Sequence, residues 1–133
     1  MIRVIKLKDL VYENIEAKYI DENGNEIWNI PSTVSELQKA YSDTLIYLSK
    51  QRLNQILEKF SYNGLADVQF YASQNDEEAL QLLDWYQAYD DAIWNWIDNE
   101  VSNITDLNNL LNLDMKAIEQ QIFDQAIQIK PLP

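Results

Sequence analysis

DEEALQLLDWYQAYDDAIWNWID, residues 76–98, contains no Gly or Pro and repeats apolar side chains at steps of three and four residues. At about 100° per residue, the apolar side chains fall on one side of a helical wheel and a line of carboxylates falls on the opposite side. The apolar stripe is Leu82, Tyr86, Tyr89, Ile93 and Ile97, and the acidic line is Glu77, Asp84, Asp91 and Asp98. We therefore predict an amphipathic helix that has Asn75 as its N-cap, runs to about Val101 and buries the apolar stripe.

Three tryptophans flank the apolar stripe, with Trp85 and Trp96 on one side and Trp94 near the acidic line. Two interpretations are open. Neighbouring helices cover both flanks, as is usual for aromatic side chains at helical spacing, or one flank stays partly exposed and binds a protein, since Trp and Tyr are favoured interface anchors. The candidate partner-binding residues are Asp84, Trp85, Asp91, Trp94 and Asp98.

Asp90 lies at the edge of the apolar stripe, and no basic residue is near it in sequence. A partly buried carboxylate is hydrogen-bonded, for instance by a Tyr hydroxyl or an indole N–H, or has a raised pKa. A catalytic role would need a second carboxylate and a cleft. The heptad spacing of the acidic line separates its members by about 10 Å, too far for one cation. We therefore predict no catalytic, cofactor-binding or metal-binding residues.

Residues 33–60 carry the features of another long helix. Thr33 and Glu36 match a capping box, and apolar residues recur at helical steps up to Phe60, with a break near Ser42–Asp43 left open. Asn63–Gly64 is expected to end this helix in the left-handed conformation. Residues 65–74 are ambiguous between a short helix and an irregular connection. A further helical stretch is expected from Thr105–Asp106 through Leu107, Leu110 and Leu111, followed by a last amphipathic segment that Pro131 stops.

The N-terminal 30 residues favour strands. Asn23–Gly24 lies between two β-rich runs and is the residue pair that tight hairpin turns prefer, and Pro31 opposes continuation of a sheet. The predicted fold class is α+β and mostly helical, with a short N-terminal antiparallel hairpin or meander followed by a bundle of three to four helices. We divide the chain into an N-terminal β unit, residues 1–31, and a helical domain, residues 32–133, within one compact domain.

Length and composition narrow the function classes. The chain has 133 residues, 47% of them hydrophobic, which suits one globular domain, and it has no apolar run near the roughly 20 residues that cross a bilayer. With no Cys and no His, it lacks disulfides, zinc-finger ligands and an imidazole base. Catalytic motifs are absent from the sequence, so we expect no enzyme.

Charge is distributed unevenly along the chain. Ten basic and 22 acidic side chains give a net charge of −12. Residues 1–59 contribute eight basic and nine acidic groups, whereas residues 60–133 contribute two and 13, so the second part carries −11 of the total. This charge disfavours direct binding of nucleic acid or anionic lipid. It indicates either a well-solvated surface or an acidic docking face for a basic protein.

Two segments resemble small bacteriophage tail and tail-fibre accessory proteins. In one of their helices an aromatic residue, a polar pair, a small-aliphatic pair and a Trp follow in order, as do Tyr89, Asp90–Asp91, Ala92–Ile93 and Trp94 here. The stretch Tyr19–Ile20–Asp21 before the turn and Ile30–Pro31 before the first helix are similar to the β element that precedes helices in such prophage proteins. The resemblance implies a structural or assembly role.

The resulting expectation is a non-enzymatic phage or prophage protein, a tail-associated component or assembly factor that binds a protein through its aromatic and acidic helix. Its location would be the cytoplasm of the bacterial host or the virion, and a homo-oligomer is left open. The alternative, from the charge, is an acidic inhibitor that mimics nucleic acid and occupies the basic groove of a host nuclease or defence protein.

Overall fold

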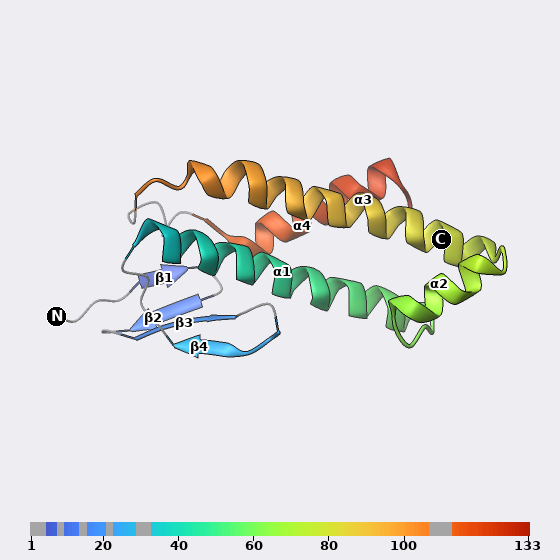
Figure 1. The fold of residues 1–133 in the computed structure, drawn as a ribbon, viewed down its shortest axis with the longest axis horizontal. Helices are drawn as coiled ribbons and strands as arrows, with labels where there is room; N and C mark the ends of the chain where they lie inside the picture. Colours follow the sequence, from blue (N-terminus) through green and yellow to red (C-terminus); the bar gives the residue numbers. More distant parts are fainter. Residues whose placement is uncertain (1–4, 8–9, 14–15, 21–22, 29–32, 107–112) are drawn as a thin grey trace.

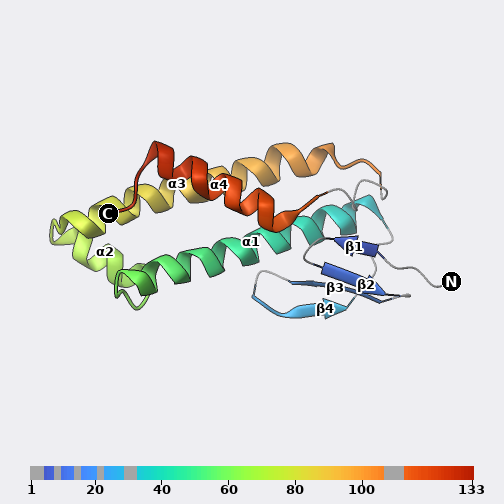
Figure 2. The same ribbon diagram turned by 180° about the vertical axis from the view of Figure 1, so that it is seen from behind.

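A computed structural model describes residues 5–7, 10–13, 16–20, 23–28, 33–106 and 113–133. Two long helices, α1 and α3, lie side by side, and the short helix α2 joins them at one end (Figure 1). Helix α4 packs against both long helices, and a small sheet lies along the N-terminal half of α1 (Figure 2). The molecule is therefore elongated, and the two long helices set its length.

The sheet has four short antiparallel strands in the order β1-β2-β3-β4. Ile20 pairs with Glu26 across the β3–β4 connection, where Gly24 has a φ of 81°. Glycine adopts this left-handed conformation at little cost. The strands are β1 Ile5–Leu7, β2 Leu10–Glu13, β3 Glu16–Ile20 and β4 Glu26–Trp28.

The predicted α+β class is wrong for the body of the molecule. Across residues 33–106 and 113–133 the chain forms four α-helices and one short 3₁₀-helix, and no strand. The strands are only three to five residues long and lie outside this body. The four α-helices, and not the N-terminal strands, therefore make up the body of the molecule. The fold class is a helical bundle.

Helix α1, Val34–Lys59, begins and ends through local hydrogen bonds. The Thr33 hydroxyl oxygen accepts a hydrogen bond from the Glu36 backbone N–H at 3.1 Å, which confirms the predicted N-cap. The helix continues through Ser42–Asp43 without a break. It ends earlier than expected, because Ser61, with a φ of 65°, takes the left-handed conformation that was assigned to Asn63–Gly64.

The next two helices are separated by a tight turn. The ambiguous residues 65–74 form α2, Leu65–Ser73, and the long acidic helix is α3, Glu77–Glu100, close to its predicted length. Its N-cap is Asp76, which accepts a hydrogen bond from the Ala79 backbone N–H at 2.9 Å. The expected cap, Asn75, instead has a φ of 62° and makes the turn between the two helices.

The chain after α3 is described in part. A short 3₁₀-helix, Val101–Asn103, follows α3 directly. The helical stretch predicted from Thr105–Asp106 through Leu107, Leu110 and Leu111 lies outside the described residues beyond Asp106. Helix α4, Met115–Ile129, has Asp114 as its N-cap and ends before Pro131, as predicted for the last segment.

The core lies between α1, α3 and α4. Leu82, Tyr89 and Ile93 of the predicted stripe are at most 2% exposed, whereas Tyr86 and Ile97 are only partly buried. The stripe prediction is therefore confirmed at its centre. The largest fully buried partners from the other two helices are Leu37, Tyr41, Leu45 and Met115.

Candidate functional site

The outer face of α3, defined here as Leu80, Asp84, Asp91, Trp94 and Asp98, points away from the core. All five side chains are exposed, and Trp94 and Leu80 keep 46% and 42% of their surface accessible. The structure thus places four of the five predicted partner-binding residues, the three aspartates and Trp94, on one accessible face. Exposing Trp94 leaves about 2 kcal/mol of burial free energy unrealised.

Trp85 does not belong to this face, so its assignment to the partner-binding set was wrong. Its side chain is 0% exposed. Its ring stacks on Tyr89 at 5.2 Å between centroids and meets Phe123 of α4 edge-on at 6.0 Å. Helix α4 covers this flank of α3, and the helical wheel could not show which flank would be covered. The Trp85 indole N–H is buried without a hydrogen-bond partner among the described residues.

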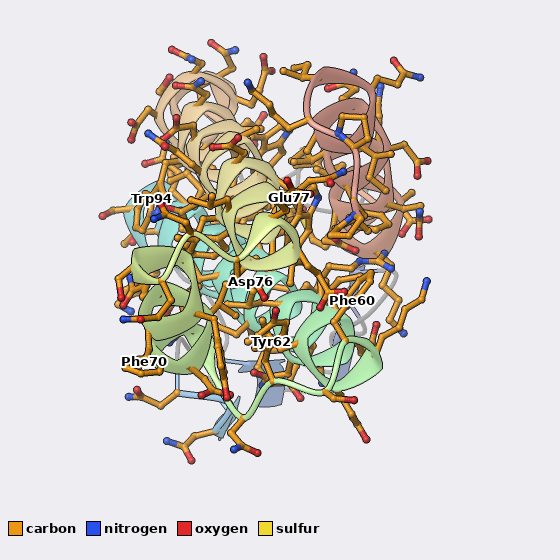
Figure 3. All side chains as sticks on the ribbon, turned by 90° about the vertical axis from the view of Figure 1, so that its right-hand side faces the viewer. Phe60, Tyr62, Phe70, Asp76, Glu77 and Trp94 are labelled. Carbon is orange, nitrogen blue, oxygen red and sulfur yellow. The ribbon has the colours of Figure 1, made fainter. Side chains whose placement is uncertain are left out.

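Helix α2 adds two exposed aromatic side chains that the sequence prediction missed. Phe70 and Tyr71 are 59% and 44% exposed, and their rings meet edge-on at 5.4 Å. Phe70 and Trp94 lie on the same flank of the bundle (Figure 3). Once residues 65–74 are taken as a helix, Val68 and Ala72 share its buried face, which turns Phe70 to the opposite side. Tyr71 lies at the edge of the buried face, so the spacing alone does not indicate its exposure. The four-residue spacing of Val68 and Ala72 was therefore the sequence signal that could have identified Phe70 as exposed.

The connection between α1 and α2 is fixed by another aromatic contact. Tyr62 meets Tyr71 edge-on at 6.0 Å, and its hydroxyl donates a hydrogen bond to Glu78 Oε1 at 3.1 Å. Desolvation first, and the Glu78 hydrogen bond second, raise the pKa of Tyr62 to about 12. Tyr62 and Phe70 lie at the end of the bundle where α2 crosses (Figure 3), and the ring of Tyr71 contacts both of them, which defines one aromatic cluster.

The surface around these aromatic side chains is acidic. No Lys or Arg occurs between Phe60 and Met115. Eight carboxylates in this segment are exposed, and they lie at the start of α3, along its outer face and just beyond its end. They are Asp76, Glu77, Glu78, Asp84, Asp91, Asp98, Glu100 and Asp106. The α2–α3 surface, defined as the outer face of α3 together with Phe70 and Tyr71, thus combines apolar anchors with negative charge.

Asp90 faces a pocket of about 130 Å³ between α1 and α3. Desolvation first, and the charge of Asp91 second, raise the pKa of Asp90, and a hydrogen bond with the Trp94 side chain opposes this shift. The expectation of a partly buried, hydrogen-bonded carboxylate is confirmed. The pocket, called the α1–α3 pocket below, is lined by Ile46, Lys50 and Leu53 of α1 and by Tyr86, Asp90 and Trp94 of α3.

A buried ionic network ties the three main helices together. Arg52 of α1 binds the Glu119 carboxylate of α4 through Nε and one terminal nitrogen, at 3.1 and 2.7 Å. Tyr89 of α3 donates a hydrogen bond to Glu119 Oε2 at 2.8 Å, and the Arg52 guanidinium lies 4.1 Å from the Phe123 ring centroid. Desolvation and the neighbouring Glu119 raise the pKa of Tyr89.

This network stabilises the packing of the three helices. Glu119 is 6% exposed, and its two oxygens are occupied by Arg52 and Tyr89. Both oxygens of the Glu119 carboxylate therefore take part in holding α1, α3 and α4 together. The sequence prediction missed the pair because Arg52 and Glu119 are 67 residues apart.

What the site offers chemically is recognition. Within the described residues, no cluster of three or more acidic, His or Cys side chains could hold a metal ion. None of the helices that the structure describes is long and apolar enough to cross a membrane. On and beside the α2–α3 surface, the accessible groups are aromatic anchors, exposed carboxylates and the Asp90 carboxylate in the α1–α3 pocket.

No family model, characterised protein or solved structure matches the chain.

Proposed function

We propose that this chain is a non-enzymatic protein-binding module that holds a basic protein partner through its α2–α3 surface. The observation that carries the proposal is the exposure of Phe70, Tyr71 and Trp94 within a segment that has no Lys or Arg. Aromatic side chains are favoured anchors at protein interfaces, where their burial supplies affinity. The surrounding carboxylates would steer a basic partner toward them.

The aromatic residues favour an assembly or structural role over catalysis. Phe70 and Trp94 come from different helices and leave large apolar areas in water, although either helix could carry polar residues there at lower cost. We propose a tail-associated component or assembly factor of a phage or prophage as the class. This assignment rests on the resemblance of the segment around Tyr89–Trp94 to phage tail and tail-fibre accessory proteins.

A second candidate function is an acidic mimic of nucleic acid that blocks a basic groove. The −11 charge of residues 60–133 favours it. The two candidates differ in what supplies the affinity. A mimic depends on charge alone, whereas the proposed module also buries Phe70 and Trp94.

The test is capture of a partner by the immobilised full chain from a bacterial lysate, at ionic strengths of about 0.1 M and about 1 M. Screening lengths fall from about 10 Å to about 3 Å over that range, so purely electrostatic complexes dissociate. The proposed module keeps its partner at high salt and loses it in the Phe70→Ala variant. Ile129→Ala is the matched control, because Ile129 is a 69% exposed apolar residue on α4.

A partner that is released at about 1 M salt, and whose capture is equal for Phe70→Ala and Ile129→Ala, would contradict the module and support the mimic. Asp91→Lys adds a kinetic criterion. In the proposed module it slows association and changes its salt dependence while the dissociation rate changes little.

A further inference from the structure

The α1–α3 pocket has an unusual combination of walls. Ile46 and Leu53 of α1 and the buried Ile93 of α3 give it an apolar interior. Asp90 supplies a partly desolvated carboxylate, and the aromatic side chains of Tyr86 and Trp94 lie beside it. An apolar interior next to a carboxylate suits a guest that has an apolar stem and a cationic head.

The size of the pocket restricts the guest. Pockets for cofactors and drug-sized ligands enclose about 300–1,000 Å³. The α1–α3 pocket encloses about 130 Å³. It therefore accommodates one long side chain from a bound protein, and it adjoins the outer face of α3 through Trp94.

We infer that the α1–α3 pocket receives an arginine side chain of the basic partner, with its guanidinium between Asp90 and the Trp94 ring. This inference rests on the proposed function and names the chemistry that the same surface recognises. A guanidinium is planar, so it stacks on an aromatic ring and binds a carboxylate through two N–H groups at once. Lysine offers a point charge without the planar fork.

The state of Asp90 explains why a cation would bind strongly there. Its carboxylate is already partly removed from water, and the adjacent charge of Asp91 destabilises it further. A cationic guest relieves both effects, and part of the desolvation of this carboxylate precedes binding.

Lys50 lies on the α1 wall of the same pocket and bears on the inference. Its side chain is exposed, and the causes that set the Asp90 pKa are desolvation, Asp91 and Trp94 rather than the Lys50 charge.

The experiment titrates the ¹⁵N-labelled full chain with N-acetyl-arginine methylamide and follows the indole N–H signals by NMR. The chain has four Trp residues, so the Trp94 signal is assigned from a Trp94→Phe spectrum. We expect a saturable shift of the Trp94 signal, and binding of N-acetyl-norleucine methylamide at least about tenfold weaker. Asp90→Asn should abolish saturation.

Glu100→Gln is the matched control, since Glu100 is an exposed carboxylate on the same helix that lies outside the α2–α3 surface and does not line the pocket. Equal effects of Asp90→Asn and Glu100→Gln would overturn the inference, because they indicate diffuse attraction to an acidic surface. A Trp94 indole signal that shifts with protein concentration in the absence of the probe would also overturn the inference, because it would mean that a second copy of the chain occupies the pocket. If the arginine probe does not bind but Phe70-dependent capture of the partner is retained, the pocket inference alone is rejected. If neither the probe nor the partner binds, the proposed function is rejected as well.

Discussion

Adjacent residues on α3 differ sharply in their exposure to solvent. Ile93 is 1% exposed, and the next residue, Trp94, is 46% exposed. The wheel built from the sequence predicted the burial of Ile93 at the centre of the apolar stripe, whereas it left open whether Trp94, on a flank, is covered or exposed. The edges of the stripe were not predictable in the same way. Whether Trp85 is buried depends on α4, which lies 30 or more residues away in sequence.

Truncation of Ile93 tests the centre of the stripe. Ile93→Ala should lower the free energy of unfolding by about 2–4 kcal/mol, because it removes buried methyl groups and leaves a cavity. Urea midpoints measure the loss. Ile129→Ala, at a 69% exposed position, should change stability by no more than about 0.5 kcal/mol. Equal losses in the two variants would mean that the helix is rotated about its axis.

Asp90 gives a prediction with a defined pH dependence. Its folded-state pKa is raised above the ordinary value of 3.8, so the fold binds the proton more tightly than the unfolded chain does. The stability that the protonated form contributes is present below pH 3.8 and is lost as the pH rises through the folded pKa. Asp90→Asn should therefore raise the thermal midpoint at pH 7 and leave it unchanged below pH 3.8.

Scanning calorimetry at the two pH values is the measurement, with Asp98→Asn as the exposed control. A lower midpoint for Asp90→Asn at pH 7 would show that the charged carboxylate stabilises the fold. That result would remove the argument that Asp90 awaits a cation from a partner.

At the scale of whole elements, caps and helix positions were predictable because they depend on a few adjacent residues. Thr33 was identified as a cap, whereas for α3 the choice between Asn75 and Asp76 was made wrongly. Both residue types cap helices well, and only the backbone shows that Asn75 adopts a positive φ. The balance between sheet and helix was misjudged because turn and β-branched patterns give no measure of how little surface short strands bury.

The N-cap of α3 yields an element-scale prediction. Asp76→Ala should cost about 0.5–2 kcal/mol, because the Ala79 N–H loses its acceptor and the positive end of the helix loses a carboxylate. Asp84→Ala, an acid-to-Ala change in the middle of the same helix, should be neutral or slightly stabilising. Chemical denaturation of the two variants side by side measures the difference.

The ionic network between α1, α3 and α4 also belongs to this scale. Glu119→Leu leaves Arg52 without its carboxylate and Tyr89 without its acceptor, so it should cost close to the lower end of about 3–5 kcal/mol. The lower end applies because the Arg52 side chain is 20% exposed. The double variant Arg52→Met/Glu119→Leu should recover a large part of that loss, since no charge stays buried unpaired. Losses that simply add in the double variant would contradict this account.

The whole molecule combines a three-helix core with a surface that leaves large aromatic side chains in water. Helices α1, α3 and α4 bury their apolar stripes against one another and are tied by the Arg52–Glu119–Tyr89 network. On the other side, α2 and the outer face of α3 leave Phe70, Tyr71 and Trp94 in water beside exposed carboxylates. The sequence predicted the acidic face and Trp94, but the contribution of α2 required the fold.

The central claim is that Trp94 serves binding whereas its neighbour Trp85 serves folding. The measurement is the same change, Trp to Ala, at two positions nine residues apart on one helix, followed by urea denaturation and partner capture. We predict that Trp85→Ala costs about 3–5 kcal/mol, because its 0% exposed ring leaves a cavity. Trp94→Ala should stay within about 1 kcal/mol of the parent and abolish capture. The account is contradicted if Trp94→Ala unfolds the bundle, or if it keeps its stability and still captures the partner.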